Sequence, residues 1–200
     1  MTSKTLYILR HGQTDLNKKG MVQGRGVDSS LNERGREQAR KTFEALKHIP
    51  FDQVYTSKLK RTHETVAHFD QSKVALEGFD EISWGSQEGV VPTDESKTLY
   101  AKTLEEWCAG NLDANLGGGE SPIQVMNRQI EAMKVVLESD HSTVLICMHG
   151  RAMRILLSWL TNSPLEEMDQ FEHANCCYYK LQYDGRKFDL IERNVTVHLD

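Results

Sequence analysis

The sequence predicts an α/β fold in which a mainly parallel β-sheet carries helices on both faces. Apolar runs at residues 6–9 and 143–148 are typical of buried strands, and both lead into His-Gly. Helical patterns lie between the predicted strands, and strands that alternate with helices imply right-handed crossovers and parallel pairing. The 200 residues contain no repeat, low-complexity block or Pro/Ser-rich linker, so we expect one domain over residues 1–200.

The N-terminal part of the chain is expected to hold two strands and a helix. The first strand is the apolar run Leu6–Leu9. Asn32 is a candidate side-chain cap for a helix that extends to about Lys47, and Pro50 ends it. Val54-Tyr55 is the second strand.

The middle of the chain has weaker patterns. Thr56-Ser57 is expected to cap a helix that runs through Arg61 to about Phe69. A short strand is expected near Val74–Leu76, and after an irregular stretch a helix is expected at about Lys97 to Cys108. These elements continue the alternation of strands and helices.

The C-terminal part has the clearest patterns. Ser121-Pro122 starts a helix, with proline in its first turn and an apolar stripe formed by Val125, Ile130, Met133 and Leu137. The strand Thr143–Met148 is followed by an amphipathic helix through Ile155 and Leu160. Residues 176–182 and 188–192, joined by Asp184-Gly185, are expected to form a closing hairpin.

Three polar side chains follow strands at one edge of the predicted sheet. His11 follows the first strand, Arg61 lies in the first turns of the helix after the second strand, and His149 follows residues 143–148. The binding crevice of such sheets lies at the carboxyl ends of the strands. We therefore expect these side chains to converge, with a glycine after each histidine that lets the backbone approach a ligand.

These residue types favour phosphoryl transfer. A neutral imidazole can attack phosphorus while the guanidinium groups of Arg10 and Arg61 bind its equatorial oxygens and offset the charge of the transition state. The leaving alkoxide must be protonated, which suits a carboxylic acid whose pKa has been raised by partial burial. Glu81 is the candidate for this acid.

Charge and composition exclude other classes of partner. The formal net charge is -5, which argues against general affinity for nucleic acid, because that affinity comes from clustered Lys and Arg. No stretch approaches the roughly 20 apolar residues of a membrane span, and we expect a protein that is neither exported nor embedded. The four cysteines have no disulfide or metal spacing, and a reducing cytoplasm is the expected location.

The segment Leu9-Arg10-His11-Gly12-Gln13-Thr14, with Asn17, resembles the signature of the histidine phosphatase superfamily, which includes cofactor-dependent phosphoglycerate mutase. The resemblance extends from Thr5 to about Lys180. Further matches occur in the family's order at Gln23-Gly24, Leu31, Glu33-Arg34-Gly35, Gln38-Ala39, Thr56-Ser57 to Arg61, Glu64-Thr65, Glu81, Gly85, Glu88-Gly89, Gly119-Glu120-Ser121 and His149-Gly150.

This resemblance implies a three-layer α/β/α sandwich of the phosphoglycerate mutase-like type, in which His11 becomes phosphorylated. Arg10, Arg61 and His149 would complete the phosphate pocket, and Glu81 would donate the proton, although Asp80 and Glu88 stand nearby. The resemblance also implies that no metal or bound coenzyme is needed. The remaining residues expected to line the phosphate or the substrate mouth are Asn17, Gln23, Gly24 and Gly150.

Residues 82–119 favour a phosphatase over a mutase. Phosphoglycerate mutases carry a longer insertion here, with adjacent arginines that hold the substrate carboxylate. This chain has no arginine in the segment and only Lys97 and Lys102 as cations. We therefore expect an open, weakly basic mouth and transfer of the phosphoryl group from a small phosphorylated metabolite to water, with a phosphoglycerate mutase as the alternative.

Two other classes of function remain as alternatives. A phospholigand-binding protein without catalysis would not require the nucleophile His11 and the acid Glu81. A metal-dependent hydrolase could also use histidines and a carboxylate, but two guanidinium groups would be repelled from a divalent cation.

Several residues are expected to lie outside the site. The histidines interpreted as surface or capping groups are His48, His63, His68, His141, His173 and His198. For His198 a second role stays open, because it lies in a C-terminal tail that could fold over the site. Apolar surface around Trp107 or Trp159 would suit a homodimer, although burial in the core is the expected explanation for both.

Overall fold

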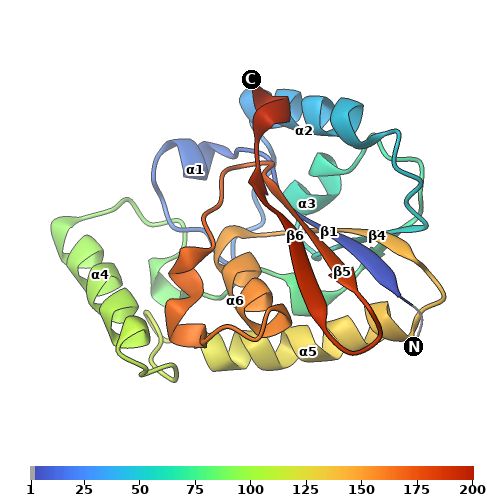
Figure 1. The fold of residues 1–200 in the computed structure, drawn as a ribbon. Coiled ribbons are helices and arrows are strands. Elements are labelled where there is room, and N and C mark those ends of the chain that lie inside the picture. Colours follow the sequence, from blue (N-terminus) through green and yellow to red (C-terminus); the bar gives the residue numbers. More distant parts are fainter. Residues whose placement is uncertain (1–2) are drawn as a thin grey trace.

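The computed structural model describes residues 3–200, and its centre is a mixed six-stranded sheet (Figure 1). The strand order is β3-β2-β4-β1-β5-β6, in which β1 to β4 pair in parallel while β5 and β6 are antiparallel. The bounds are Lys4–Arg10 for β1, Gln53–Thr56 for β2, Lys73–Ala75 for β3, Thr143–Met148 for β4, Tyr178–Tyr183 for β5 and Phe188–Val195 for β6. The expected mainly parallel sheet and the closing hairpin are confirmed.

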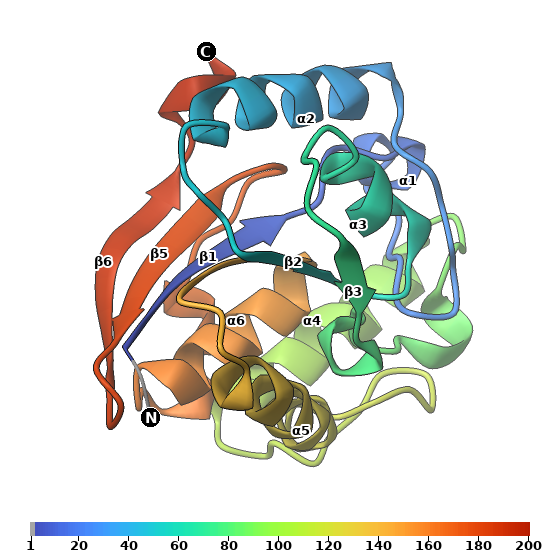
Figure 2. The ribbon, with the colours of Figure 1, turned by 90° about the vertical axis from the view of Figure 1, so that its right-hand side faces the viewer.

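Helices cover both faces of this sheet, as Figure 2 shows for α2 and α3 on one side and for α4, α5 and α6 on the other. Their bounds, with the short α1, are Asp15–Lys18 for α1, Glu33–Leu46 for α2, Lys60–Thr65 for α3, Asp94–Cys108 for α4, Pro122–Glu138 for α5 and Gly150–Leu160 for α6. The expected α/β/α arrangement is confirmed.

Alternate residues of β1 supply the two layers of the core. Leu6 and Ile8 belong to a buried cluster with α5 and α6, whereas Tyr7 and Leu9 belong to a second buried cluster with the end of α2. Successive side chains of a strand point to opposite faces, so a continuous apolar run is what a strand covered on both sides requires. The whole of β1 is therefore fixed, and its carboxyl end is a rigid platform.

The helix after β2 differs from the prediction. It spans only Lys60–Thr65, and its N-cap is Leu59, which makes no side-chain capping bond. The expected cap residue Ser57 instead uses its hydroxyl to accept a hydrogen bond from the Leu59 N–H and to contact His149. The prediction that Ser57 caps the helix was therefore wrong. A hydroxyl group just before a helix can cap that helix or contact a polar site, and the sequence pattern is the same in both cases.

The other helices agree better with the sequence patterns. Asn32 caps α2 by accepting a hydrogen bond from the Gly35 N–H, and Ser121 caps α5. Helix α4 starts three residues earlier than expected because Thr93 and Ser96 form a capping box. On α5 the buried face includes Gln129 in place of Ile130, and its amide donates a hydrogen bond of 2.7 Å to the Ala152 carbonyl of α6.

Within residues 3–200, none of the helices has the length and apolar character needed to cross a membrane.

Candidate active site

The two histidines expected to converge lie at the ends of neighbouring parallel strands. His11 follows β1 and His149 follows β4, and the His11 N–H donates a hydrogen bond of 3.0 Å to the Met148 carbonyl. Their ring centroids are 5.1 Å apart. The register of β1 on β4, which pairs Arg10 with Met148, therefore places both imidazoles at one point.

His11 is held in one tautomer. It is 2 % exposed, and its Nδ1 lies 2.7 Å from the Gly12 carbonyl oxygen, which can only accept a hydrogen bond. Nδ1 therefore carries the hydrogen, and Nε2 keeps its lone pair. Burial, followed by the charges of Arg61 and Arg10, lowers the pKa of His11 well below its ordinary value. The ring is a neutral base with one available nitrogen, as a nucleophile needs to be.

His149 is also held in one tautomer, with both ring nitrogens engaged. Nδ1 accepts a hydrogen bond of 3.1 Å from Nε of Arg61, so Nε2 carries the hydrogen and donates it to the Ser57 hydroxyl at 2.8 Å. Burial and then the charge of Arg61 lower the pKa of His149 well below its ordinary value. The sequence indicated His149 but gave no sign of the part that Ser57 plays.

Arg61 is fully buried at the back of the site. Beyond its bond to His149, it donates to the Val27 carbonyl at 2.8 Å and to the Gly24 carbonyl at 3.1 Å. These contacts use three of the five N–H groups of a guanidinium, which leaves two for another acceptor. Burial lowers the pKa of Arg61 to about 10, against the raising effect of Glu81 and other acids, so it stays cationic at neutral pH.

Arg10 is the second guanidinium beside His11. Its Nε is buried and has no hydrogen-bond partner among the described residues. A buried donor without a partner costs free energy, so this atom is ready for an anionic ligand. Gly150 makes the approach possible, because a Cβ there would lie 3.2 Å from that Nε and 2.8 Å from Cε1 of His173. Gly12, in contrast, lies against the backbone of Gly35 rather than facing open space for a ligand.

Glu81 reaches the site from the segment that follows the 3-10 turn Glu77–Phe79. Its Oε1 accepts hydrogen bonds from the backbone N–H groups of Ile82 at 2.9 Å and Ala152 at 2.8 Å, and its Oε2 accepts one from the backbone N–H of Arg151 at 3.1 Å. The carboxyl group therefore lies against the first turn of α6. Because Oε2 accepts one hydrogen bond only, it retains a lone pair for a proton.

The other two acids near Glu81 are engaged elsewhere. Asp80 accepts hydrogen bonds from the Lys58 N–H and from Arg25, while Glu88 accepts from the N–H groups of Gly26 and Trp84. Of the three acids, Glu81 alone lines the cavity that contains His11.

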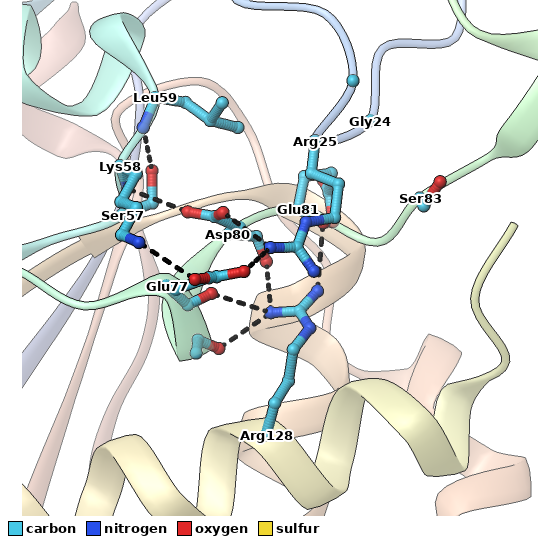
Figure 3. Close-up of polar contacts among 12 residues, drawn as sticks. Gly24, Arg25, Ser57, Lys58, Leu59, Glu77, Asp80, Glu81, Ser83 and Arg128 are labelled. Carbon is cyan, nitrogen blue, oxygen red and sulfur yellow. Dashed lines mark hydrogen bonds and ion pairs between the residues drawn. The ribbon is translucent and has the colours of Figure 1, made fainter.

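An arginine on α5 fixes the backbone that carries Glu81 (Figure 3). Arg128 donates hydrogen bonds of 2.9 Å to the carbonyls of Gly78 and Asp80 and one of 3.0 Å to the carbonyl of Glu81 itself. Its Nε and Nη2 also bind both oxygens of Glu120, at 2.9 and 3.0 Å. From the opposite side, Arg25 forms ion pairs with Glu120 and with the side chains of Glu77 and Asp80. Sequence patterns did not indicate Arg128 or Arg25.

Asn17 and Gln23 line the same cavity as His11. The Asn17 carboxamide oxygen accepts from the Thr14 N–H and from Asn175, both at 3.2 Å, so its amino group points away from these contacts. Gln23 donates to the Thr14 hydroxyl at 2.9 Å and accepts from Ser29 at 2.7 Å. Gly24, Arg61 and His149 are not among the residues that line the cavity, although the His149 ring centroid lies 5.1 Å from that of His11.

The cavity has a volume of about 400 Å³ and is more basic than expected. Apolar side chains such as Met21, Trp84 and Tyr100 form part of its wall. Its cationic side chains are Arg10, Lys97, Arg151 and Arg154, against the single carboxylate of Glu81. The expectation of a weakly basic mouth was wrong, because α6 supplies the arginines that residues 82–119 lack.

Two of the remaining histidines also differ from the interpretation above. His173 is no surface group: it lines the cavity, and burial together with Arg10 and Arg154 lowers its pKa to about 3. His198 contacts the Thr42 hydroxyl and the Cys176 carbonyl, so the C-terminal tail packs against α2 and does not cover the site. Trp107 is 1 % exposed, and its place in the core agrees with the expectation.

Over residues 3–200 there is no group of three or more His, Cys, Asp or Glu side chains placed to hold a metal ion.

Comparison with known proteins supports the resemblance at both the sequence and the fold level. Phosphoserine phosphatase 1 of Hydrogenobacter thermophilus is 27% identical, with 97% of this chain and 93% of the relative covered. A 2,3-bisphosphoglycerate-dependent phosphoglycerate mutase of Parvibaculum lavamentivorans is 30% identical, with 94% and 97% covered. The solved structure of Bacillus stearothermophilus YhfR has a TM-score of 0.87 and 26% identity over 98% of this chain and all of that one.

The model of the histidine phosphatase superfamily, branch 1, matches residues 6–196. This match includes both strand ends, the two histidines and the segment that carries Glu81. The chain therefore belongs to the histidine phosphatase superfamily.

Proposed function

We propose that the protein hydrolyses phosphate monoesters of small metabolites through a phosphohistidine formed on His11. The observation that carries this proposal is the state of His11: a buried, neutral imidazole whose Nδ1 contacts the Gly12 carbonyl and whose Nε2 has no hydrogen-bond partner among residues 3–200. It shares one cavity with the guanidinium of Arg10 and the carboxyl of Glu81. These are the three groups that transfer of a phosphoryl group to nitrogen requires.

In the first step, Nε2 of His11 attacks phosphorus as the bond from phosphorus to the ester oxygen breaks. The leaving alkoxide takes a proton from Oε2 of Glu81, which leaves the product alcohol and a carboxylate. Arg10 would bind the equatorial oxygens, and Arg61, a buried cation whose charge already acts on His11, would offset their charge. His149 orients Arg61 through Nδ1, and its own orientation depends on Ser57.

In the second step, water attacks the phosphohistidine. The Glu81 carboxylate accepts a proton from that water as the nitrogen–phosphorus bond breaks, so inorganic phosphate forms and both residues return to their starting states. The same carboxyl group serves as acid and then as base, as microscopic reversibility requires. Both proton transfers use the lone pair of Oε2 that the backbone contacts leave free.

Because the relatives include a phosphatase and a mutase, the first test must show whether the phosphoryl group is transferred to water or to a second phosphoglycerate. The phosphoserine phosphatase relative favours water, and the bisphosphoglycerate-dependent mutase relative keeps phosphoglycerate mutase as the second candidate. Release of inorganic phosphate from phosphoserine and 3-phosphoglycerate should be compared with conversion of 3- to 2-phosphoglycerate in the presence of 2,3-bisphosphoglycerate. Faster interconversion than hydrolysis would replace the phosphatase by the mutase.

The role of His11 is tested separately by His11→Ala. We expect it to lose the burst of product that precedes steady-state turnover and to lose activity by at least about 10³-fold, as nucleophile removal does in enzymes that form a covalent intermediate. Hydrolysis by His11→Ala at a rate close to that of the wild type would contradict the mechanism.

Three further expectations remain proposals. We propose a single catalytic domain over residues 1–200 and a cytoplasmic location, which suits four cysteines that are all free. We also propose a homodimer, for which the partly exposed Trp159 is a candidate contact. Sedimentation of the purified protein would test the last of these.

A further inference from the structure

The cavity contains a second cationic centre that the phosphoryl-transfer mechanism does not use. Arg151 lies in the first turn of α6, two residues after His149, and is 6 % exposed. Its Nη1 donates to Asp169 at 2.5 Å, and its guanidinium carbon lies 5.4 Å from the centre of the Trp107 ring. One ion pair and one aromatic face thus hold the planar group in place.

Arg151 has donors left over for a ligand. Its Nε and Nη2 have no hydrogen-bond acceptor among residues 3–200, yet neither atom is sealed from solvent, and the side chain lines the cavity. A guanidinium presents its N–H groups in a fixed fork that matches the two oxygens of a carboxylate. The geometry therefore offers an anion-binding edge in the same cavity as His11.

The charges around Arg151 also favour a ligand with an anionic group. Asp169 is the only carboxylate paired with either Arg151 or Arg154 among the described residues, so two guanidinium groups share one negative charge. Lys97 also lines the cavity from α4, where it forms an exposed ion pair with Asp94 at 3.4 Å. His173, whose pKa these arginines and Arg10 help to lower, adds no charge at neutral pH. The two guanidinium groups of α6 therefore outnumber the one carboxylate that forms ion pairs with them.

We propose that Arg151 binds a carboxylate of the substrate, so that the enzyme selects phosphate monoesters whose alcohol part carries a carboxylate. This inference rests on the proposed function, since it concerns the substrate of that same cavity. The phosphate would contact Arg10 and His11, and the carboxylate would contact the free edge of Arg151. Arg154 would act as a positioning residue, because it shares Asp169 and donates to the Phe171 carbonyl at 2.9 Å.

Matched pairs of substrates test the proposal. Phosphoserine differs from phosphoethanolamine by its carboxylate, and 3-phosphoglycerate differs from glycerol 3-phosphate by the same group in place of an alcohol. We expect the wild type to prefer the carboxylated member by roughly 10- to 100-fold in kcat/KM, which is the range for hydrogen bonds to a charged group. A ratio near one in the wild type would overturn the inference.

The variant Arg151→Met should reduce that ratio to within about threefold, mainly through a higher KM for the carboxylated member. The matched control is Arg186→Met, which removes one exposed arginine in the β5–β6 turn and should keep the wild-type ratio. If Arg151→Met does not fold, Arg151→Lys replaces it, and its ratio should fall at least threefold because an ammonium cannot make the forked contact. An unchanged ratio in the folded Arg151 variant would overturn the proposal.

This test separates the two proposals. If the wild type hydrolyses both members of a pair equally and still forms a phosphohistidine, the proposed function stands and the carboxylate site falls. If neither member yields phosphate and no phosphohistidine forms, the proposed function itself is wrong.

Discussion

Replacement of Arg128 by alanine tests how the general acid is positioned. Arg128 lies far from the reacting atoms along the chain, on α5, but its guanidinium binds the carbonyls of residues 78, 80 and 81 and the carboxylate of Glu120. These contacts fix the backbone from which the Glu81 side chain reaches α6 (Figure 3). Arg128→Ala should therefore reduce stability and activity together.

The expected loss of stability follows from the contacts. Four backbone carbonyls and both oxygens of Glu120 lose a donor, and a net hydrogen bond contributes about 1 kcal/mol, with more for a charged pair. The side chains of Arg128 and Glu120 are 16% and 18% exposed, so water can replace part of what is lost. We expect the free energy of unfolding to fall by about 2–4 kcal/mol at pH 7, and kcat to fall by about 10²-fold if the Glu81 carboxyl is displaced by about 1 Å.

The pH dependence gives this prediction a second readout. Burial raises the pKa of Glu120, but the hydrogen bonds and charge of Arg128, together with the Ser83 N–H and the charge of Arg25, outweigh burial and leave the pKa lowered. A lowered pKa contributes stability above the unfolded value near 4.3, and that contribution is lost as pH falls through the folded value. The difference in stability between the wild type and Arg128→Ala should therefore shrink as pH falls below about 4.

Urea unfolding at pH 7 and at pH 3.5, with kcat measured at pH 7, provides the test. Arg128→Lys is the matched control, because it keeps the charge but loses the forked contacts, and it should show an intermediate loss. A change in unfolding free energy below about 1 kcal/mol together with a kcat within twofold of the wild type would refute the positioning role.

Three other changes follow from the same contacts. Ser57→Ala removes the acceptor of the His149 Nε2 hydrogen bond, and we expect kcat to fall by about tenfold with a smaller change in KM; an unchanged kcat would show that this bond does not orient His149. Gly150→Ala places a Cβ 2.8 Å from His173 and 3.2 Å from Arg10, so inhibition by inorganic phosphate should weaken by at least about tenfold, and equal inhibition would contradict the assigned position of Arg10. The folded pKa of His173 is about 3, whereas its unfolded pKa is near 6.5. Between these values the unfolded chain binds a proton at His173 that the native state does not bind. As pH falls through this range, the free energy of unfolding therefore decreases by up to about 1.4 kcal/mol per pH unit from this residue. His173→Asn should reduce that slope between pH 6 and 5 in urea titrations, and an identical slope would show that His173 is protonated in the native state.

The sequence was sufficient to predict those strands and helices whose residue patterns are typical of only one kind of element. The apolar runs of β1 and β4 could only be buried strands, and the glycine and histidine that follow each run placed the two imidazoles at one sheet edge. Side-chain caps such as Asn32 and Ser121 also fixed helix starts, because the geometry of a cap is local.

Residues whose role depends on a distant partner were not predictable in this way. Ser57 reads as a cap and becomes a partner of His149, which lies 92 positions later. Arg128 and Glu81 meet only because α5 packs beside the turn at 77–79. Glu81 was a candidate acid before the family was considered, but only the resemblance to the family favours it over Asp80 and Glu88, since nothing in its local pattern distinguishes it from them.

The basic character of the cavity was missed although a signal was present. Arg151 and Arg154 are three positions apart in the helix that follows His149, and that spacing places side chains on one face. Residues 82–119 contain no arginine, whereas the helix that starts directly after His149 supplies two arginines to the cavity.

The position of the phosphoryl group on the His11 ring tests the central claim most directly. The enzyme would be quenched in base during turnover of phosphoserine, and the phosphorylated peptide would be identified by mass spectrometry and by the ³¹P shift that distinguishes the two ring nitrogens. Because Nδ1 donates to the Gly12 carbonyl, we predict phosphate on Nε2 of His11. Phosphate on Nδ1, on another residue, or on no residue while turnover continues would contradict the account.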